Sequence, residues 1–137
     1  MKIVFVDSLY WIATIREGDQ HQRAAFDAMI ALKGAHFVTT EEVLVEFFSG
    51  LCRSTQQVRQ AGLEMVRNLL QKSDVTVVQQ SHESFLAGLN FYERRLDQGY
   101  SLVDCISMST MRRRRIRDVL SSDRHFAREG FRSLIRV

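Results

Sequence analysis

The chain is 137 residues long, 45% hydrophobic and 26% charged, with a formal net charge of +3. These values are typical of a globular protein with a sizeable core, and we expect a single domain over residues 1–137. No apolar run is long enough to span a membrane, and the N-terminal residues lack the pattern of a signal peptide. The composition therefore argues against a membrane-spanning protein and favours a cytoplasmic one, in which both cysteines stay reduced.

Positive charge is concentrated toward the C-terminus. Nine of the 16 arginines lie from Arg112 onward, whereas the chain has only three lysines. Because arginine binds phosphate through two parallel hydrogen bonds and stacks on bases, the run Arg112–Arg115 is a candidate for binding a nucleic acid. A solvated helix face is the alternative, and charge alone favours that alternative slightly.

Apolar periodicity and helix-capping residues predict an alternation of strands and helices along the chain. The expected strands are residues 2–6, 36–39, 75–78, 119–120 and 134–135. The expected helices begin at Ser8, about His21, Thr40, about Thr55, Ser81, Ser101 and about Arg124. Strands that alternate with helices predict a parallel sheet with helices on both faces. The expected fold class is therefore three-layer α/β/α, with five parallel strands and about seven helices.

Four acidic residues stand out at strand ends or within helices: Asp7, Glu46, Asp104 and Asp123. Asp7 directly follows the first strand, and Asp123 follows the fourth strand after two serines. Carboxylates at the carboxyl ends of parallel strands lie where open α/β sheets bind their ligands. Because no cysteine or histidine cluster accompanies them, they indicate a site for a hard divalent cation such as Mg²⁺ or Mn²⁺. Such a site suits the hydrolysis of phosphodiester bonds.

Each of these acids also has an ordinary structural explanation. Asp7 and Asp123 are favoured residue types for helix N-caps, although Ser8 could cap the first helix in place of Asp7. Glu46 lies among apolar residues and is expected to face at least partly inward. Asp104 lies between apolar neighbours in the first turn of a helix, where a salt bridge is the alternative. The four together favour a common site, because a buried charge needs a partner or a metal ion.

The segments that carry these acids resemble the motifs of the PIN domain, most closely those of its VapC-type toxin branch. The matching features are Val4–Ser8, the inward Glu46, Tyr100–Met108 and Leu120–Phe126, and in this order they cover essentially the whole chain. The resemblance implies a compact nuclease that cleaves single-stranded RNA with Mg²⁺ or Mn²⁺. We therefore expect the cation to activate the attacking water while a carboxylate orients that water.

The resemblance also implies roles for individual residues. Asp7, Glu46, Asp104 and Asp123 would form the acidic set, with Asp7 and Asp104 as the most direct metal ligands and the other two acting partly through water. Ser121 matches a hydroxyl position that supports the last acid. The chain departs from the family at His125, where an acid is frequent, and this change is expected to weaken a second metal site.

The resemblance further implies partners. For a toxin these are a cognate antitoxin, bound in a groove near the acids, and a second copy of the chain. We expect the homodimer surface on Leu9, Tyr10, Trp11 and the helix near Phe47–Phe48, which carry more apolar surface than the sheet needs there.

Two other function classes remain in view. The main alternative is a catalytically silent PIN-like domain with an RNA-binding or regulatory role, and the intact acids argue against it. A phosphotransfer receiver also has five strands and an acidic pocket, but it needs paired acids after the first strand and a late lysine. Here Asp7 stands alone, and no lysine follows Lys72.

Overall fold

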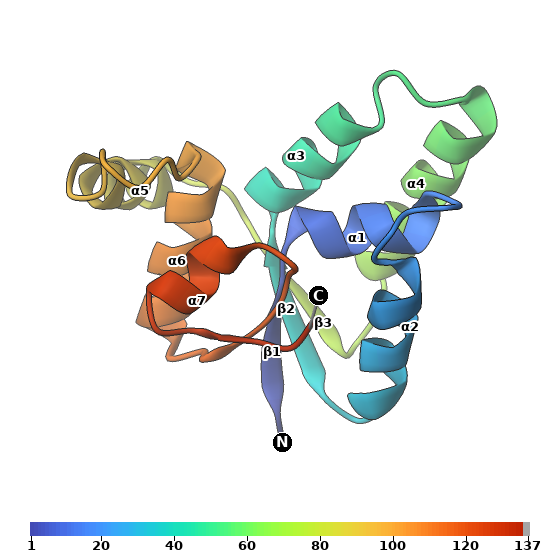
Figure 1. Ribbon diagram of the computed structural model, residues 1–137, viewed down its shortest axis with the longest axis horizontal. Helices are drawn as coiled ribbons and strands as arrows, with labels where there is room; N and C mark the ends of the chain where they lie inside the picture. The colour runs from blue at the N-terminus through green and yellow to red at the C-terminus, as the bar shows by residue number, and fades with distance from the viewer. Residues whose placement is uncertain (136–137) are drawn as a thin grey trace.

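A single sheet of five parallel strands forms the centre of the computed structural model, which describes residues 1–135 (Figure 1). The strand order is β3-β2-β1-β4-β5, and every neighbouring pair is parallel. The strands are β1 (Ile3–Val6), β2 (His36–Thr40), β3 (Val75–Val78), β4 (Asp118–Leu120) and β5 (Arg132–Ser133). Because the chain order runs outward in both directions from β1, the switch point of the sheet lies between β1 and β4.

Helices cover both faces of the sheet, which confirms the expected three-layer α/β/α class (Figure 1). In Figure 1, α1, α2 and α4 lie to the right of the strands and α5, α6 and α7 to the left. The seven helices in the described residues are α1 (Ser8–Ile15), α2 (Gln22–Ala31), α3 (Glu41–Gly50), α4 (Gln56–Leu69), α5 (His82–Glu93), α6 (Leu102–Arg114) and α7 (Arg124–Arg128). Among residues 1–135, no helix combines the length and apolar character that crossing a membrane requires.

Most of the helix starts follow the expected capping chemistry, and the first does not. The hydroxyl of Thr40 accepts a hydrogen bond from the Val43 amide, and Ser81 and Ser101 each cap a helix in the same way. The expected Ser8 cap is wrong, because Ser8 is already the first residue of α1 and Asp7 occupies the N-cap position. The Asp7 side chain makes no capping hydrogen bond, so its carboxylate is not used by the helix backbone.

The last strand was expected two residues too late. It lies at Arg132–Ser133 rather than at 134–135, in register with Asp118 and Val119 of β4. The guanidinium of Arg132 donates to both carboxylate oxygens of Asp118 at 2.7 and 3.1 Å, which adds a side-chain contact to the backbone pairing of the two strands. The apolar pair Leu134–Ile135 follows the strand, and Ile135 packs into the core from there. The apolar character of Leu134–Ile135 therefore indicated a contact with the core rather than a strand.

The apolar surface expected for a homodimer is largely buried, which contradicts the expected exposure of its residues. Tyr10, Trp11 and Phe47 are buried within the chain, because they pack in the core beside β1. In the expected region, Leu9 and, on the helix that carries Phe47, Val45 are well exposed. Exposed large apolar side chains gather instead on α5 and just after it, at Phe85, Leu86, Leu89, Tyr92 and Leu96.

Candidate active site

The four acids expected to act together line one pocket. Asp7, Glu46, Asp104 and Asp123 share it with Ser8, Leu9, Ile12, Ser49, Gly50 and Ser101. Asp7 follows β1 and Asp123 follows β4, on either side of the switch point, while Glu46 comes from α3 and Asp104 from α6. The site therefore lies where the carboxyl ends of the central strands meet two helices, which is the usual ligand position in an open α/β sheet.

Asp7 is the most deeply buried member, with 2% of its surface exposed. The hydroxyl of Ser121 donates to Asp7 Oδ2 at 2.8 Å and accepts a hydrogen bond from the Asp123 amide at 3.0 Å. Ser121 thus connects the end of β1 to the loop after β4. The other carboxylate oxygen, Oδ1, is buried and has no hydrogen-bond partner among the described residues. A buried acceptor without a partner is costly, and a bound cation is one way to satisfy it.

Glu46 is held by the residue expected to cap α1. The Ser8 hydroxyl donates to Glu46 Oε1, and Ser8 itself is buried. Because the two residues are 38 positions apart, this contact was not visible in the sequence. It fixes a partly exposed glutamate against the same pocket as Asp7.

Asp104 and Asp123 each use one carboxylate oxygen at a helix start. Asp104 Oδ2 accepts from the Ser101 amide at 3.0 Å in a capping box, and Asp123 Oδ1 accepts from the His125 amide at 2.9 Å. The cap explanation is therefore correct for Asp123, and the salt-bridge alternative for Asp104 has no support among the described residues. In each case the second oxygen forms no hydrogen bond with the described chain, which leaves it free for a ligand.

The carboxylates raise one another's pKa. Burial raises the pKa of Asp7 from its ordinary value of 3.8 to about 7, against the Ser121 hydrogen bond, and repulsion from Asp104 and Glu46 adds to the shift. Burial also raises the pKa of Glu46 and of Asp104, and the charge of Asp123 raises both further. The acids are thus close enough to repel, which a divalent cation would relieve.

The structure groups His125 with two of the acids, although the sequence indicated this residue only as a departure from the family pattern. Ligand atoms of Asp104, Asp123 and His125 all lie within 4.8 Å of one another, and Asp7 and Glu46 fall outside this group. His125 Nε2 lies 3.2 Å from Asp123 Oδ1. In the sequence, the indication that His125 lies beside the acids was its position two residues after Asp123, at the start of a helix. The expectation that Asp7 and Asp104 are the most direct ligands stays a prediction.

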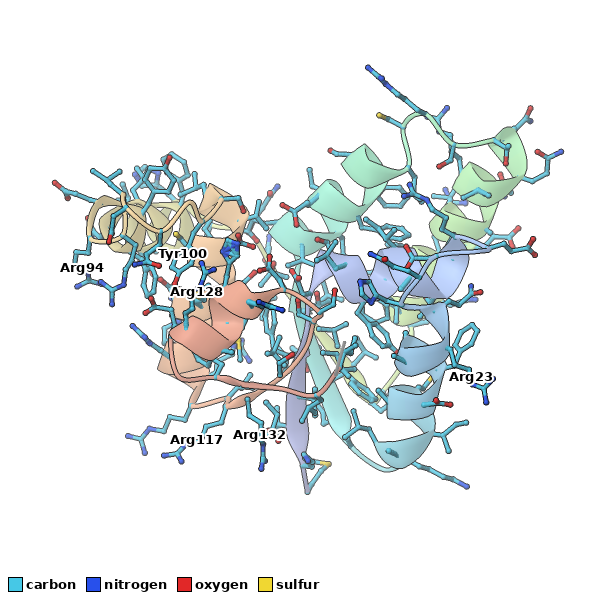
Figure 2. The ribbon with its side chains drawn as sticks, in the orientation of Figure 1. Arg23, Arg94, Tyr100, Arg117, Arg128 and Arg132 are labelled. Carbon is cyan, nitrogen blue, oxygen red and sulfur yellow. The ribbon has the colours of Figure 1, made fainter. Side chains whose placement is uncertain are left out.

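The arginine run lies away from this pocket. Arg112 pairs with Glu129 at 3.1 Å, and its guanidinium lies over the ring of Phe91, so it has a structural role. Arg114 ends α6, about 15 Å along the helix from Asp104 at 1.5 Å per residue. Figure 2 shows Arg117 and Arg132 near the N-terminal ends of the strands, whereas the acids follow the carboxyl ends of β1 and β4. Contact between Arg112–Arg115 and RNA stays a prediction.

Comparison with known proteins identifies the family. The PIN-domain family model matches residues 4–131. The chain therefore belongs to the PIN-domain family, as its motifs indicated. A search of curated proteins finds no match.

Solved structures of VapC and VapBC proteins share the fold. The chain is similar to VapC20 of Mycobacterium tuberculosis, described as a Sarcin-Ricin loop cleaving toxin, with a TM-score of 0.82, 23% identity, and 93% of this chain and 95% of that chain covered. It is also similar to chains of DNA-bound VapBC2 from Rickettsia felis (TM-score 0.66, 15% identity, 92% of each chain covered) and DNA-bound VapBC from Salmonella typhimurium (0.64, 16%, 97% of each). At these identities the likeness shows the shared fold.

The raised pKa of Asp7 predicts a pH-dependent gain in stability for Asp7→Asn. Well below pH 3.8 the carboxyl is protonated in both folded and unfolded chains, so the two proteins should unfold with similar free energies. Between pH 4 and 7 the unfolded chain ionises while folded Asp7 keeps its proton, so wild-type stability falls. Above pH 7, without added metal, the variant should be the more stable by up to about 4 kcal/mol.

Urea unfolding from pH 4 to pH 9 measures this difference. Asp97→Asn is the matched control, because Asp97 is an exposed carboxylate outside the pocket and its replacement should leave the stability profile unchanged. A variant that is less stable than the wild type at pH 8 would contradict the prediction.

Proposed function

We propose that this protein is a divalent-metal-dependent endoribonuclease that hydrolyses phosphodiester bonds in single-stranded RNA, acting in the cytoplasm as the toxin of a type II toxin–antitoxin pair. One observation carries the proposal: four carboxylates from distant parts of the chain line one pocket, and a buried oxygen of Asp7 has no partner there among the described residues. Membership of the PIN-domain family and the shared fold with VapC proteins support it.

The donor set suits Mg²⁺ or Mn²⁺. Asp7 offers the unpartnered oxygen, while Asp104 and Asp123 each offer the oxygen not used at a helix start. The cation would supply Lewis-acid chemistry, making water more acidic and offsetting the charge that develops on the phosphate. Glu46, held by Ser8 and partly exposed, is positioned to orient the attacking water and accept its proton. Ser121 acts as a positioning residue for Asp7.

The proposed activity predicts metal-dependent cleavage that needs the acids. The purified chain should cut a single-stranded RNA with Mg²⁺ or Mn²⁺ and stop when a chelator is added. Asp104→Asn should lower the cleavage rate roughly 100-fold, equivalent to about 2.7 kcal/mol, because it removes a charged ligand but keeps an acceptor for the Ser101 amide. Gel analysis of a labelled RNA measures the rate. A hairpin of the sarcin–ricin type should be tested in parallel, since VapC20 cleaves that loop.

The controls separate the remaining readings. Asp97→Asn should cut like the wild type, and undiminished cleavage by Asp104→Asn would rule out this site. RNA binding without cleavage would instead favour a catalytically silent PIN-like domain.

In an RNA-binding assay, replacing Arg113 and Arg114 by alanine should flatten the salt dependence of the binding constant by about one log–log unit per lost phosphate contact. An unchanged slope would make that run a solvated helix face.

The antitoxin was expected in a groove near the acids, but a cavity on the other face of α1 offers a more enclosed apolar position, and the antitoxin is proposed to occupy it. This cavity of about 380 Å³ is lined mainly by apolar side chains, among them Tyr10, Trp11, Phe37 and Leu69. The Tyr10 hydroxyl and Trp11 Nε1 are buried without a partner in the described residues, and both side chains line this cavity. Trp11 is the single tryptophan. Its fluorescence should change when the antitoxin binds, and a complex with unchanged fluorescence would contradict this location.

The homodimer is proposed to form through the exposed apolar residues of α5. Light scattering should give a dimer for the wild type and a monomer for Leu89→Asp, because a charge on this face opposes burial. Val45→Asp, at an exposed apolar position on α3, should remain dimeric. A wild-type monomer up to roughly 100 μM, the range of weak association, would argue against the dimer and leave the nuclease proposal untouched.

A further inference from the structure

The imidazole of His125 lies where a metal ligand would lie. Its Nε2 is 3.2 Å from Asp123 Oδ1, and both residues form the group within 4.8 Å that also includes Asp104. Two ligand atoms bonded at about 2.1 Å to one ion lie about 3.0 Å apart when they subtend a right angle at it. The observed 3.2 Å is close to that spacing and is also the distance of a direct contact, because this oxygen already accepts from the His125 amide; the second oxygen of Asp123 stays free within the described chain for a cation beside the ring.

The ring is held in place by a buried network. It packs edge-on against Tyr100, with ring centres 4.8 Å apart, on the α6–α7 side of the molecule (Figure 2). The Tyr100 hydroxyl donates to Glu129 at 2.9 Å, and Glu129 is paired with Arg95 and Arg112 at 2.9 and 3.1 Å. These ion pairs fix Tyr100 behind the imidazole, whereas the ring's own Nδ1 is buried without a hydrogen-bond partner among the described residues.

A second observation indicates a cation in the pocket that Asp104 and Asp123 line, next to His125. Asp7 Oδ1 lies in a side chain with only 2% of its surface exposed, and nothing in the described chain donates to it. Asp7 lines the pocket together with Asp104 and Asp123. A positive ion in that pocket would offset the charge of this buried carboxylate, although Asp7 itself lies outside the Asp104–Asp123–His125 group.

We propose that His125 is a nitrogen ligand of the cation held by Asp104 and Asp123, and that it makes the site prefer first-row transition ions over Mg²⁺. Magnesium favours oxygen ligands, whereas an imidazole nitrogen strengthens binding of softer divalent ions. This inference rests on the proposed cation site and extends it to metal selectivity. The other reading of His125 is a histidine that only pairs with Asp123, which gives no nitrogen bond to the metal.

Pulsed electron paramagnetic resonance of added Mn²⁺ distinguishes these readings. With the full-length wild-type protein, the electron-spin echo should be modulated by a directly bound ¹⁴N, and labelling the histidines with ¹⁵N should change that modulation. His125→Gln should lose it. His82→Gln should keep it, because His82 is exposed at the start of α5 and outside the pocket. The labelled wild type gives the result even if His125→Gln fails to fold.

Competition between Mn²⁺ and Mg²⁺ for the site measures its metal selectivity. His125→Asp restores an all-oxygen donor set, so the ratio of Mn²⁺ to Mg²⁺ affinity should fall about tenfold or more. Bound Mn²⁺ without nitrogen modulation, no Mn²⁺ binding, or an unchanged affinity ratio would each overturn the inference. Neither measurement uses RNA. A protein that binds Mn²⁺ through nitrogen but cuts no RNA would refute only the nuclease, and cleavage without nitrogen modulation would refute only the His125 ligand.

Discussion

The buried carboxylate of Asp7 is the constraint on which the rest of the site depends. It ends the central strand, accepts one hydrogen bond from Ser121, and leaves its other oxygen without a partner among the described residues. Placing a charge in such a position costs several kcal/mol unless it is compensated. The chain can relieve that cost by keeping Asp7 protonated, as its raised pKa indicates, or by binding a cation between Asp7 and the other acids.

The topology explains how residues so far apart in sequence meet at this point. Because β1 lies between β2 and β4, the segments that follow β1 and β4 leave the sheet on either side of the switch point. The starts of α1 and α6 also face the pocket through Ser8 and Ser101, and the positive ends of these helices partly offset the carboxylates. The sheet thus concentrates negative charge where the helix ends can stabilise it.

The sequence predicted the parts of the structure that depend on local pattern. Alternating elements gave the α/β class, and a charge directly after a buried strand identified Asp7 before any contact was known. Contacts between distant residues were not predictable in this way. Ser8 binds Glu46, 38 positions away, and Arg132 of β5 pairs with Asp118 of β4. The expectation of exposed apolar surface near Trp11 was wrong, because an apolar run does not reveal whether its side chains are buried, as Trp11 is.

The central claim is that these carboxylates form a divalent-cation site, and a crystal grown with Mn²⁺ tests it most directly. Anomalous scattering at a wavelength that excites manganese would locate the ion independently of any assumption about ligands. The account predicts one peak in the pocket lined by Asp7, Asp104 and Asp123, at about 2 Å from carboxylate oxygens. A pocket without anomalous density at saturating Mn²⁺, or density only at other surface acids, would contradict it.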